Sequence, residues 1–225
     1  MCFSETQSYI NTVLLVMGGL YVYPNYRLSI PLIFLAFKDL IQGLLYHYHS
    51  KNNEKSKNIL TSFSWIHICF QPLFVNIFMS HFSKENIYYW NSIFIISFLY
   101  GLYALTTLNE FDIQNDPDCI KKNEKNDFCS THTTSYMGKY HIAYKFSQDK
   151  ESLLYSSIYP ILMFVPALFT KSRILGIIWA VFVGSIYLFL NTIGDGEQAA
   201  IWCFLSILCS LPMAIFHKRV SKLLF

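Results

Sequence analysis

Residues 28–47 read LSIPLIFLAFKDLIQGLLYH, a run in which Lys38 and Asp39 are the only formally charged side chains. A membrane core about 30 Å thick is crossed by about 20 helical residues, which satisfy their backbone polar groups within the helix. The run therefore has the length and composition of a membrane-spanning helix. Its two charged side chains lie where lipid is expected, so Lys38 and Asp39 are candidate functional residues.

The whole chain shares this apolar character. Of its 225 residues, 53% are hydrophobic, 18% are aromatic and only 14% are charged. Soluble domains carry about 25% charged residues. This composition excludes a disordered chain, a disulfide-rich miniprotein and a typical cytosolic enzyme. The net charge of +3 is too small and too dispersed for a nucleic-acid surface, so we expect no nucleic-acid partner.

Seven apolar runs predict an all-α fold, a polytopic membrane protein whose seven transmembrane helices form one bundle and one membrane domain over residues 1–225. The segment before the first run has no Lys or Arg and carries Glu5, so we expect no cleaved signal peptide. The first and fifth runs are short for a span, near the lower limit of about 17 residues. The predicted spans are residues 9–23, 28–47, 59–80, 87–108, 153–169, 174–190 and 198–216.

The distribution of Lys and Arg in short loops predicts the orientation in the bilayer. With the C-terminus inside, the short inner segments carry seven basic residues and the short outer loop carries three, while the long outer segment adds six lysines but counts little because of its length. We therefore expect an N-terminus outside or in a lumen, a cytoplasmic C-terminus, and a hydrophilic outer loop over residues 109–151. The inner set is Arg27, Lys84, Lys171, Arg173, Lys218, Arg219 and Lys222, and the outer set is Lys51, Lys55 and Lys57.

The hydrophilic loop contains two cysteines, Cys119 and Cys129. They are candidates for a disulfide if the loop faces an oxidising compartment. Two alternatives stay open, namely free thiols and a metal site shared with His132 and His141. The spacing of these four residues matches no standard zinc pattern.

Small residues recur every four positions in the sixth run, at Gly176, Ala180 and Gly184. Such a stripe lets a neighbouring helix approach closely, and the neighbour can belong to a second copy of the chain. We therefore keep oligomerisation through this stripe as one interpretation. A chance pattern in an apolar run is the other.

The second run presents Asp39, Gln42 and Tyr46 on one stripe of a helix. An ionisable side chain at the middle of a span costs about 2.5 to 3.5 kcal/mol, so it needs a partner or a purpose. The stripe is typical of a polar cavity. An ion pair that only fixes the packing of helices is the alternative.

The third run reads Trp65-Ile66-His67-Ile68-Cys69-Phe70-Gln71-Pro72. His67 and Gln71 lie on one helical face, and Ser64 lies one turn earlier. Pro72 lacks an amide hydrogen and frees a backbone carbonyl nearby. We interpret His67 and Gln71 as candidate functional residues, with Trp65 beside them as a ligand contact. A histidine satisfied by packing is the alternative.

The last run begins after Glu197 and continues through Trp202-Cys203-Phe204, in which Trp202 is a candidate ligand contact. Glu197 either belongs to a functional site or only caps the helix. Cys2 would become an N-terminal thiol after removal of Met1, and it is either a nucleophile, an acylation site or inert. The predicted topology places four of these residues toward the outer surface, namely Glu197, Cys2, His67 and His141.

Four segments together resemble a family of multi-span membrane proteins of unknown function that begin Met-Cys-x-Ser and occur in bacteria, algae and large DNA viruses. The resemblance implies a multi-span membrane fold over nearly the whole chain and assigns no activity. The segments are Met1-Cys2-Phe3-Ser4, the helix with Trp65, His67, Gln71 and Pro72, the stretch YMGKYHIAY at 136–144, and Gly196-Glu197-Gln198 with Trp202-Cys203-Phe204.

We predict an integral membrane protein with an outward-facing polar pocket that binds a small or lipid-like ligand. Whether it is an enzyme stays open: a membrane-embedded hydrolase or transferase is one alternative, and a transporter or channel using Lys38 and Asp39 is another. In the enzyme, His67 or His141 is the general base. Glu197 or Asp39 orients that base or holds a metal ion, and Cys2 is a candidate nucleophile. A metal ion stays open as cofactor, whereas retinal is not expected because the last run has no lysine. The pocket residues are Asp39, Gln42, His67, Gln71, His141 and Glu197.

Overall fold

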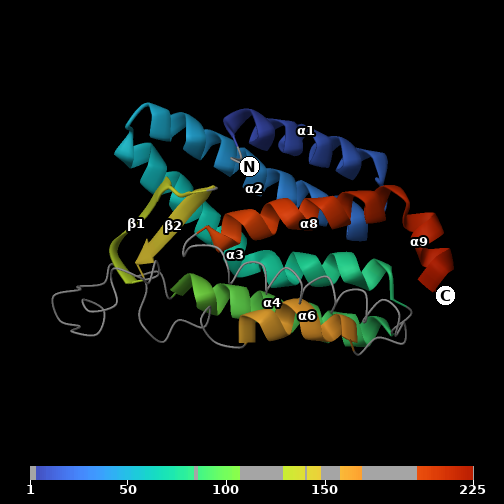
Figure 1. Ribbon diagram of the computed structural model, residues 1–225. Coiled ribbons are helices and arrows are strands. Elements are labelled where there is room, and N and C mark those ends of the chain that lie inside the picture. Colours follow the sequence, from blue (N-terminus) through green and yellow to red (C-terminus); the bar gives the residue numbers. More distant parts are fainter. Residues whose placement is uncertain are drawn as a thin grey trace.

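The computed structural model describes residues 4–83, 86–106, 129–139, 141–147, 158–168 and 197–224. In this part of the chain the long helices lie side by side as a bundle, with a β-hairpin at one end and a short terminal helix at the other (Figure 1). The elements are α1 (Glu5–Tyr21), α2 (Tyr26–Ser50), α3 (Glu54–His81), α4 (Ile87–Thr106), β1 (Cys129–Met137), β2 (Ile142–Ser147), α6 (Ile158–Leu168), α8 (Gln198–Ile215) and α9 (His217–Leu224).

Local side-chain contacts set where the helices begin. Ser4 precedes α1, and its hydroxyl accepts a hydrogen bond of 3.2 Å from the Gln7 amide. Asn53 precedes α3, and its side chain accepts one of 3.1 Å from the Ser56 amide. Each cap satisfies a backbone donor that has no partner within the helix. Only a short turn therefore separates α2 from α3, and the two helices run antiparallel.

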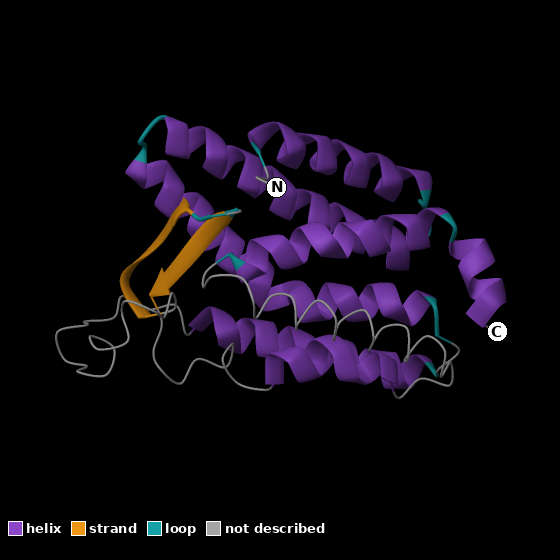
Figure 2. Cartoon of the chain, viewed as in Figure 1, coloured by secondary structure: helices purple, strands orange, loops and turns teal. Residues whose placement is uncertain are grey.

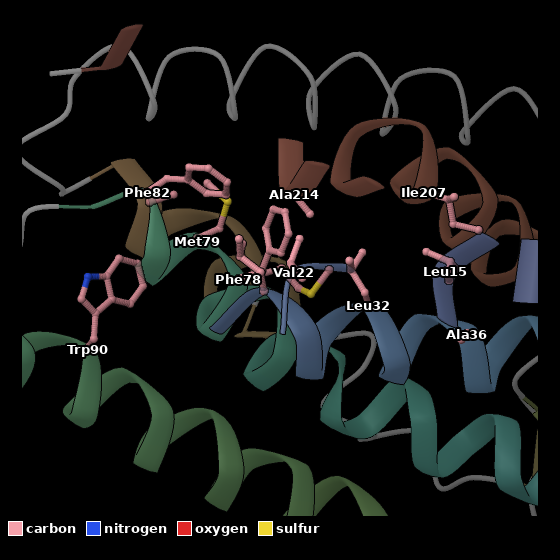
Figure 3. Packing of buried hydrophobic residues seen from close by; sticks show 13 residues of the cluster. Leu15, Val22, Leu32, Ala36, Phe78, Met79, Phe82, Trp90, Ile207 and Ala214 are labelled. Atoms are coloured by element: carbon pink, nitrogen blue, oxygen red, sulfur yellow. The ribbon is translucent and has the colours of Figure 1, made fainter. Parts of the chain in front are cut away.

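The centre of the bundle is formed by α2 and α3. The first lies against α1, α3 and α8, and the second lies against α2, α4 and α6. Apolar side chains fill the half of the bundle that lies away from the hairpin (Figure 3). This core contains Leu15, Val22, Leu28, Leu32, Ala36, Phe78, Met79, Phe82, Trp90, Met163, Ala167, Ile207 and Ala214.

One buried amide links three helices. The Asn76 side chain on α3 donates to the Leu162 carbonyl on α6 at 2.8 Å and to the Ser97 hydroxyl on α4 at 3.3 Å. It also donates to the Pro72 carbonyl at 2.9 Å, one turn earlier in α3. These bonds fix the positions of α4 and α6 relative to α3 inside an otherwise apolar interior.

The prediction of seven transmembrane helices is wrong. Among the described residues, only α2 and α3 are both long and apolar enough to cross a membrane. The run at 9–23 became α1 with 17 residues, and the helix found within 153–169 is α6 with 11, whereas a span needs about 20. The prediction depended on apolar runs alone, and a buried core helix produces the same signal as a span. The run at 174–190 lies outside the described residues, and so do Gly176, Ala180 and Gly184.

The predicted hydrophilic loop also contains regular structure, so the purely α-helical fold class is incomplete. Strands β1 and β2 form an antiparallel hairpin within 109–151 (Figure 2). Its second strand is not solvated, because Ile142, Ala143 and Tyr144 are almost completely buried against the helices. The pattern was missed because an apolar strand of this length is too short to register as a span.

The predicted orientation of the two chain ends was derived from an odd number of spans. That count is wrong, so the orientation has lost its basis and stays an untested prediction. What the structure supports is narrower: α2 and α3 are candidate membrane spans by length and composition.

Candidate functional site

Helix α2 buries polar side chains in the interior of the bundle. Lys38, Asp39 and Gln42 are 0%, 2% and 1% exposed. The predicted stripe of Asp39, Gln42 and Tyr46 is therefore fully inside. Lys38 lies off that stripe, yet it is buried too, because α1, α3 and the hairpin together surround this part of α2.

The hairpin provides the partner of the buried ammonium group. Lys38 Nζ donates to the Tyr144 hydroxyl at 3.1 Å and lies 4.2 Å from the centre of the same ring. The phenol oxygen and the negative face of the ring both stabilise a cation, which partly replaces the lost water. Residues 106 positions apart in sequence thus meet in the protein interior.

A chain of side-chain amides leads from the edge of α1 to the buried carboxylate. Gln7, which is partly exposed, donates to the Asn11 side-chain oxygen at 2.8 Å. Asn11 in turn lies 3.5 Å from Asp39 Oδ1, at the long limit of a hydrogen bond. These two hydrogen-bonded amides give Asp39 a polar connection toward the surface of α1.

His67 on α3 is held against α2 by its ring and by one nitrogen. The ring stacks on Phe34 with centroids 3.8 Å apart, and Nε2 lies 3.1 Å from the Phe34 carbonyl oxygen. A carbonyl only accepts, so Nε2 carries the hydrogen and Nδ1 is left as an acceptor. Lys38 is close enough to His67 and His141 to act on both electrostatically.

Gln71 contacts a different helix from its neighbour His67. Its side-chain oxygen accepts a hydrogen bond of 2.7 Å from the Tyr159 hydroxyl on α6. Trp65 is fully buried and packs on Phe146 of the hairpin, with ring centroids 4.7 Å apart. Both predicted contacts thus lie in the interior and help to attach α6 and the hairpin to α3.

Several buried polar atoms of α2 and α3 have no hydrogen-bond partner among the described residues: Asp39 Oδ2, both amide atoms of Gln42, Ser64 Oγ and His67 Nδ1. We call Lys38, Asp39, Gln42, Ser64 and His67 the polar cluster. Buried polar atoms in proteins are almost always paired, with protein, water or ligand, because an unpaired one costs about 1 to 3 kcal/mol. Unpaired buried atoms of this kind are candidate contacts for ordered water or a polar ligand.

Glu197 lies at the cap position of α8, but its side chain makes no capping hydrogen bond. It accepts hydrogen bonds from the backbone amides of Lys139 and His141 at 2.7 and 2.6 Å. A Cβ added at Gly138 would lie 2.5 Å from the Glu197 carboxyl carbon, so only glycine permits this approach. Glu197 therefore fixes the hairpin turn to the start of α8, and its predicted catalytic role stays untested.

His141 lies inside the hairpin turn against α2. It is 3% exposed, and its ring is 5.7 Å from that of Tyr46. Its Nδ1 accepts a hydrogen bond of 2.7 Å from the Ile142 amide. Burial, and secondarily the positive charge of Lys38, lower the pKa of His141 to about 3. His141 is thus a neutral imidazole at physiological pH.

Other predicted site residues lie outside the described part of the chain. Cys2 and Cys119 are among them, and for Cys129 and Trp202 only the backbone is described. The disulfide and the role of Trp202 therefore stay predictions. Within the described residues, no three His, Cys, Asp or Glu side chains gather as metal ligands do.

Two residues of the site were not predicted, Asn11 and Tyr144. An amide within an apolar run was the available signal for Asn11, because such a group needs a partner in the interior. Tyr144 gave no comparable signal. Its pairing with Lys38 depends on the fold of the hairpin, which the sequence pattern did not show.

The fold and the site define a mainly helical protein with buried polar groups on its two central helices. The chain belongs to a family described as "Family of unknown function (DUF5765)", which matches residues 12–223. No curated protein and no solved structure matches the chain. Membership in a family without assigned function is thereby confirmed. The membrane character and the distribution among organisms implied by the resemblance stay predictions.

Replacing Glu197 by Gln should destabilise the protein. The amide group keeps the shape but can accept from only one of the two backbone N–H groups, and a lost charge-assisted hydrogen bond costs about 2 kcal/mol. Thermal unfolding of the purified variant measures this. Glu5→Gln is the matched control, because Glu5 makes a partly exposed pair with His47 at 3.3 Å and should cost less than about 1 kcal/mol. Equal losses of stability in the two variants would contradict the role of Glu197 in holding the hairpin turn.

Lowering the pH should reduce the free energy of unfolding through protonation of His141 in the unfolded chain. In the unfolded chain this histidine titrates near the ordinary pKa of 6.5 and in the folded protein near 3, so between these values the unfolded chain binds more protons. The free energy of unfolding therefore falls as the pH decreases through this window, by about 2 kcal/mol from pH 7 to pH 5. The variant His141→Gln should show a smaller loss over the same range. Identical pH dependence in the two proteins would contradict this assignment.

Proposed function

We propose that this protein lies in a membrane and that its polar cluster binds a small polar ligand. One observation carries the ligand proposal: Asp39, Gln42 and His67 are buried with hydrogen-bonding atoms that have no protein partner among the described residues. A bound molecule, or water that it displaces, satisfies these atoms. The helices α2 and α3 are the segments that we place across the membrane.

The distribution of side chains supports the membrane location. Met17 and Leu20 are 62% and 67% exposed, whereas Lys38 and His67 are 0% and 1% exposed. In water this arrangement is unfavourable, because large apolar surfaces associate and buried charges lose hydration. In lipid the cost of exposing large apolar side chains disappears, because hydrocarbon chains surround them. Further exposed apolar side chains on α1 to α4 are Ile10, Val13, Leu14, Ile30, Ile33, Phe37, Ile59, Phe63, Ile95, Ile96, Phe98, Leu99 and Leu102.

The donors and acceptors of the cluster indicate the class of ligand. Lys38 has three N–H donors, and the bond to Tyr144 uses one of them. The remaining donors favour a carboxylate, phosphate or hydroxyl oxygen. Asp39 Oδ2 and His67 Nδ1 are acceptors and favour a hydroxyl or amine hydrogen. A small molecule that carries both an anionic or oxygen-rich group and a hydroxyl or amine group satisfies both sides.

One observation favours a second candidate function, a membrane-embedded hydrolase or transferase. The bond from His67 Nε2 to the Phe34 carbonyl fixes the ring so that Nδ1 presents its lone pair, as a general base requires. Asp39 Oδ2 is a second acceptor in the same cluster. The two functions differ in outcome, because a binding protein releases its ligand unchanged and an enzyme releases a product.

The membrane location predicts that the protein resists extraction. Alkaline carbonate removes peripheral proteins and leaves integral ones in the bilayer, because apolar side chains hold the latter in the hydrocarbon. After such treatment the protein should remain in the membrane pellet and enter the soluble fraction only with detergent. Complete release by carbonate would refute the membrane location.

The ligand proposal predicts a molecule that co-purifies with the protein and depends on Gln42. Mass spectrometry of extracts from the purified protein should detect it, and Gln42→Leu should lower its occupancy about 10-fold or more, since a buried hydrogen bond to the ligand is lost. The stability of the empty variant should stay within about 1 kcal/mol of wild type, because the amide it removes has no protein partner among the described residues.

Asn76→Leu is the matched control, the same change at a buried amide whose nitrogen donates to protein carbonyls. It should cost about 2 kcal/mol of stability, through the lost bonds to the Pro72 and Leu162 carbonyls, and leave the ligand in place. The proposal fails if the extracts contain no such molecule, or if both variants retain it equally.

A further inference from the structure

The end of the bundle opposite the hairpin carries a concentration of basic side chains. Helix α9 exposes Lys218, Arg219 and Lys222, while Val220 packs against the apolar core. On a helix, Lys218 and Lys222 are one turn apart and project from the same side. The core contact of Val220 therefore fixes α9 so that its basic side faces outward.

A further cation, Arg27 on α2, and a histidine, His81 on α3, lie at this end. Arg27 Nη1 donates to the Ser80 carbonyl at 3.5 Å, beside His81. The rings of His81 and His217 are 5.5 Å apart, so the first residue of α9 lies against the end of α3. The start of α2, the end of α3 and α9 thus meet at one place (Figure 1).

His81 has a buried nitrogen without a partner in the described part of the chain. Its Nδ1 lies 3.1 Å from the Asn25 side-chain nitrogen, which can only donate. The hydrogen of the neutral ring is therefore on Nε2, and this buried N–H donor has no partner among the described residues. An unpaired donor beside Arg27 and α9 fits an acceptor that carries negative charge.

The described carboxylates lie elsewhere in the molecule. Glu5 pairs with His47 at the hairpin end, Glu54 begins α3 at that same end, Glu197 holds the hairpin turn, and Asp39 belongs to the polar cluster. Across the residues that the structure describes, no ion pair involves the basic residues of α9. Among the described residues, their charge is therefore not neutralised by a carboxylate.

We propose that this end of the bundle binds the phosphate group of an anionic phospholipid, with Arg27, His81 and the basic side of α9 as its contacts. The apolar neighbours favour a lipid over a free phosphate: Phe216 and Leu223 are 52% and 80% exposed beside the lysines. Basic side chains exposed together with large apolar ones, Leu223 on α9 and Phe216 directly before it, are typical of a segment at a membrane surface. The inference rests on the membrane location alone and is independent of the polar-cluster ligand.

Native mass spectrometry of the full-length protein in detergent tests this directly, with phosphatidylglycerol and phosphatidylcholine added in turn. The wild type should retain phosphatidylglycerol preferentially. Lys218→Gln with Lys222→Gln should reduce that preference about 10-fold, because each lysine near a membrane surface contributes to anionic-lipid binding. Added salt should weaken the preference of the wild type in the same direction.

Lys51→Gln with Lys55→Gln is the charge-matched control, since both of these lysines are exposed at the hairpin end. This variant should keep the wild-type preference. His81→Phe retains a ring and removes the unpaired donor, so it should weaken phosphatidylglycerol binding with α9 intact. Excess inorganic phosphate should not displace the lipid.

Equal binding of the two lipids by the wild type, or equal losses in the two double variants, would overturn the proposal. Displacement by inorganic phosphate would overturn the lipid as the source of the anion. Retention in the pellet after carbonate treatment, without any lipid preference, would refute this inference and leave the membrane location standing.

Discussion

A fully buried ammonium group, that of Lys38, constrains how the rest of the structure is arranged. A charge taken out of water must find polar partners, and within the described residues Tyr144 of the hairpin provides both a hydroxyl and a ring face. The hairpin must therefore pack into the bundle. Glu197 holds the hairpin turn to the start of α8. Its hydrogen bonds and the contact between Lys38 and Tyr144 therefore stabilise the same position of the hairpin.

The protein places polar groups inside and apolar groups outside along its central helices. Asn11, Asp39, Gln42 and His67 face the interior, while the opposite sides of the same helices expose large apolar residues. Lipid favours the outer side of this arrangement, because hydrocarbon surrounds the exposed apolar face, while the unpaired interior atoms suit a polar ligand or ordered water. The basic end at α9 adds a surface suited to anionic headgroups. Interior site, apolar face and basic end thus fit one location in a membrane.

The sequence identified many of the residues that matter and misjudged how they are assembled. Asp39, Gln42 and His67 were selected as polar groups in apolar runs, and His141 and Glu197 as titratable groups expected on the same side of the membrane. All five are buried. The number of spans was wrong, since apolar runs also mark core helices. The role of Glu197 was ambiguous for a related reason: its position at a helix start predicted a cap, but its oxygens bond amides 56 and 58 positions earlier.

By itself, the sequence determined which segments are apolar, where α2 and α3 lie, and which buried polar side chains require partners, because these properties depend on composition and local spacing. Only the tertiary structure decided which residues pair with these buried polar side chains. Tyr144 meets Lys38, and α9 meets His81, through contacts between distant segments, and no periodicity along the chain encodes them. The free energy of burying a charge depends on the groups around it in space, so the site became visible only when the chain was folded.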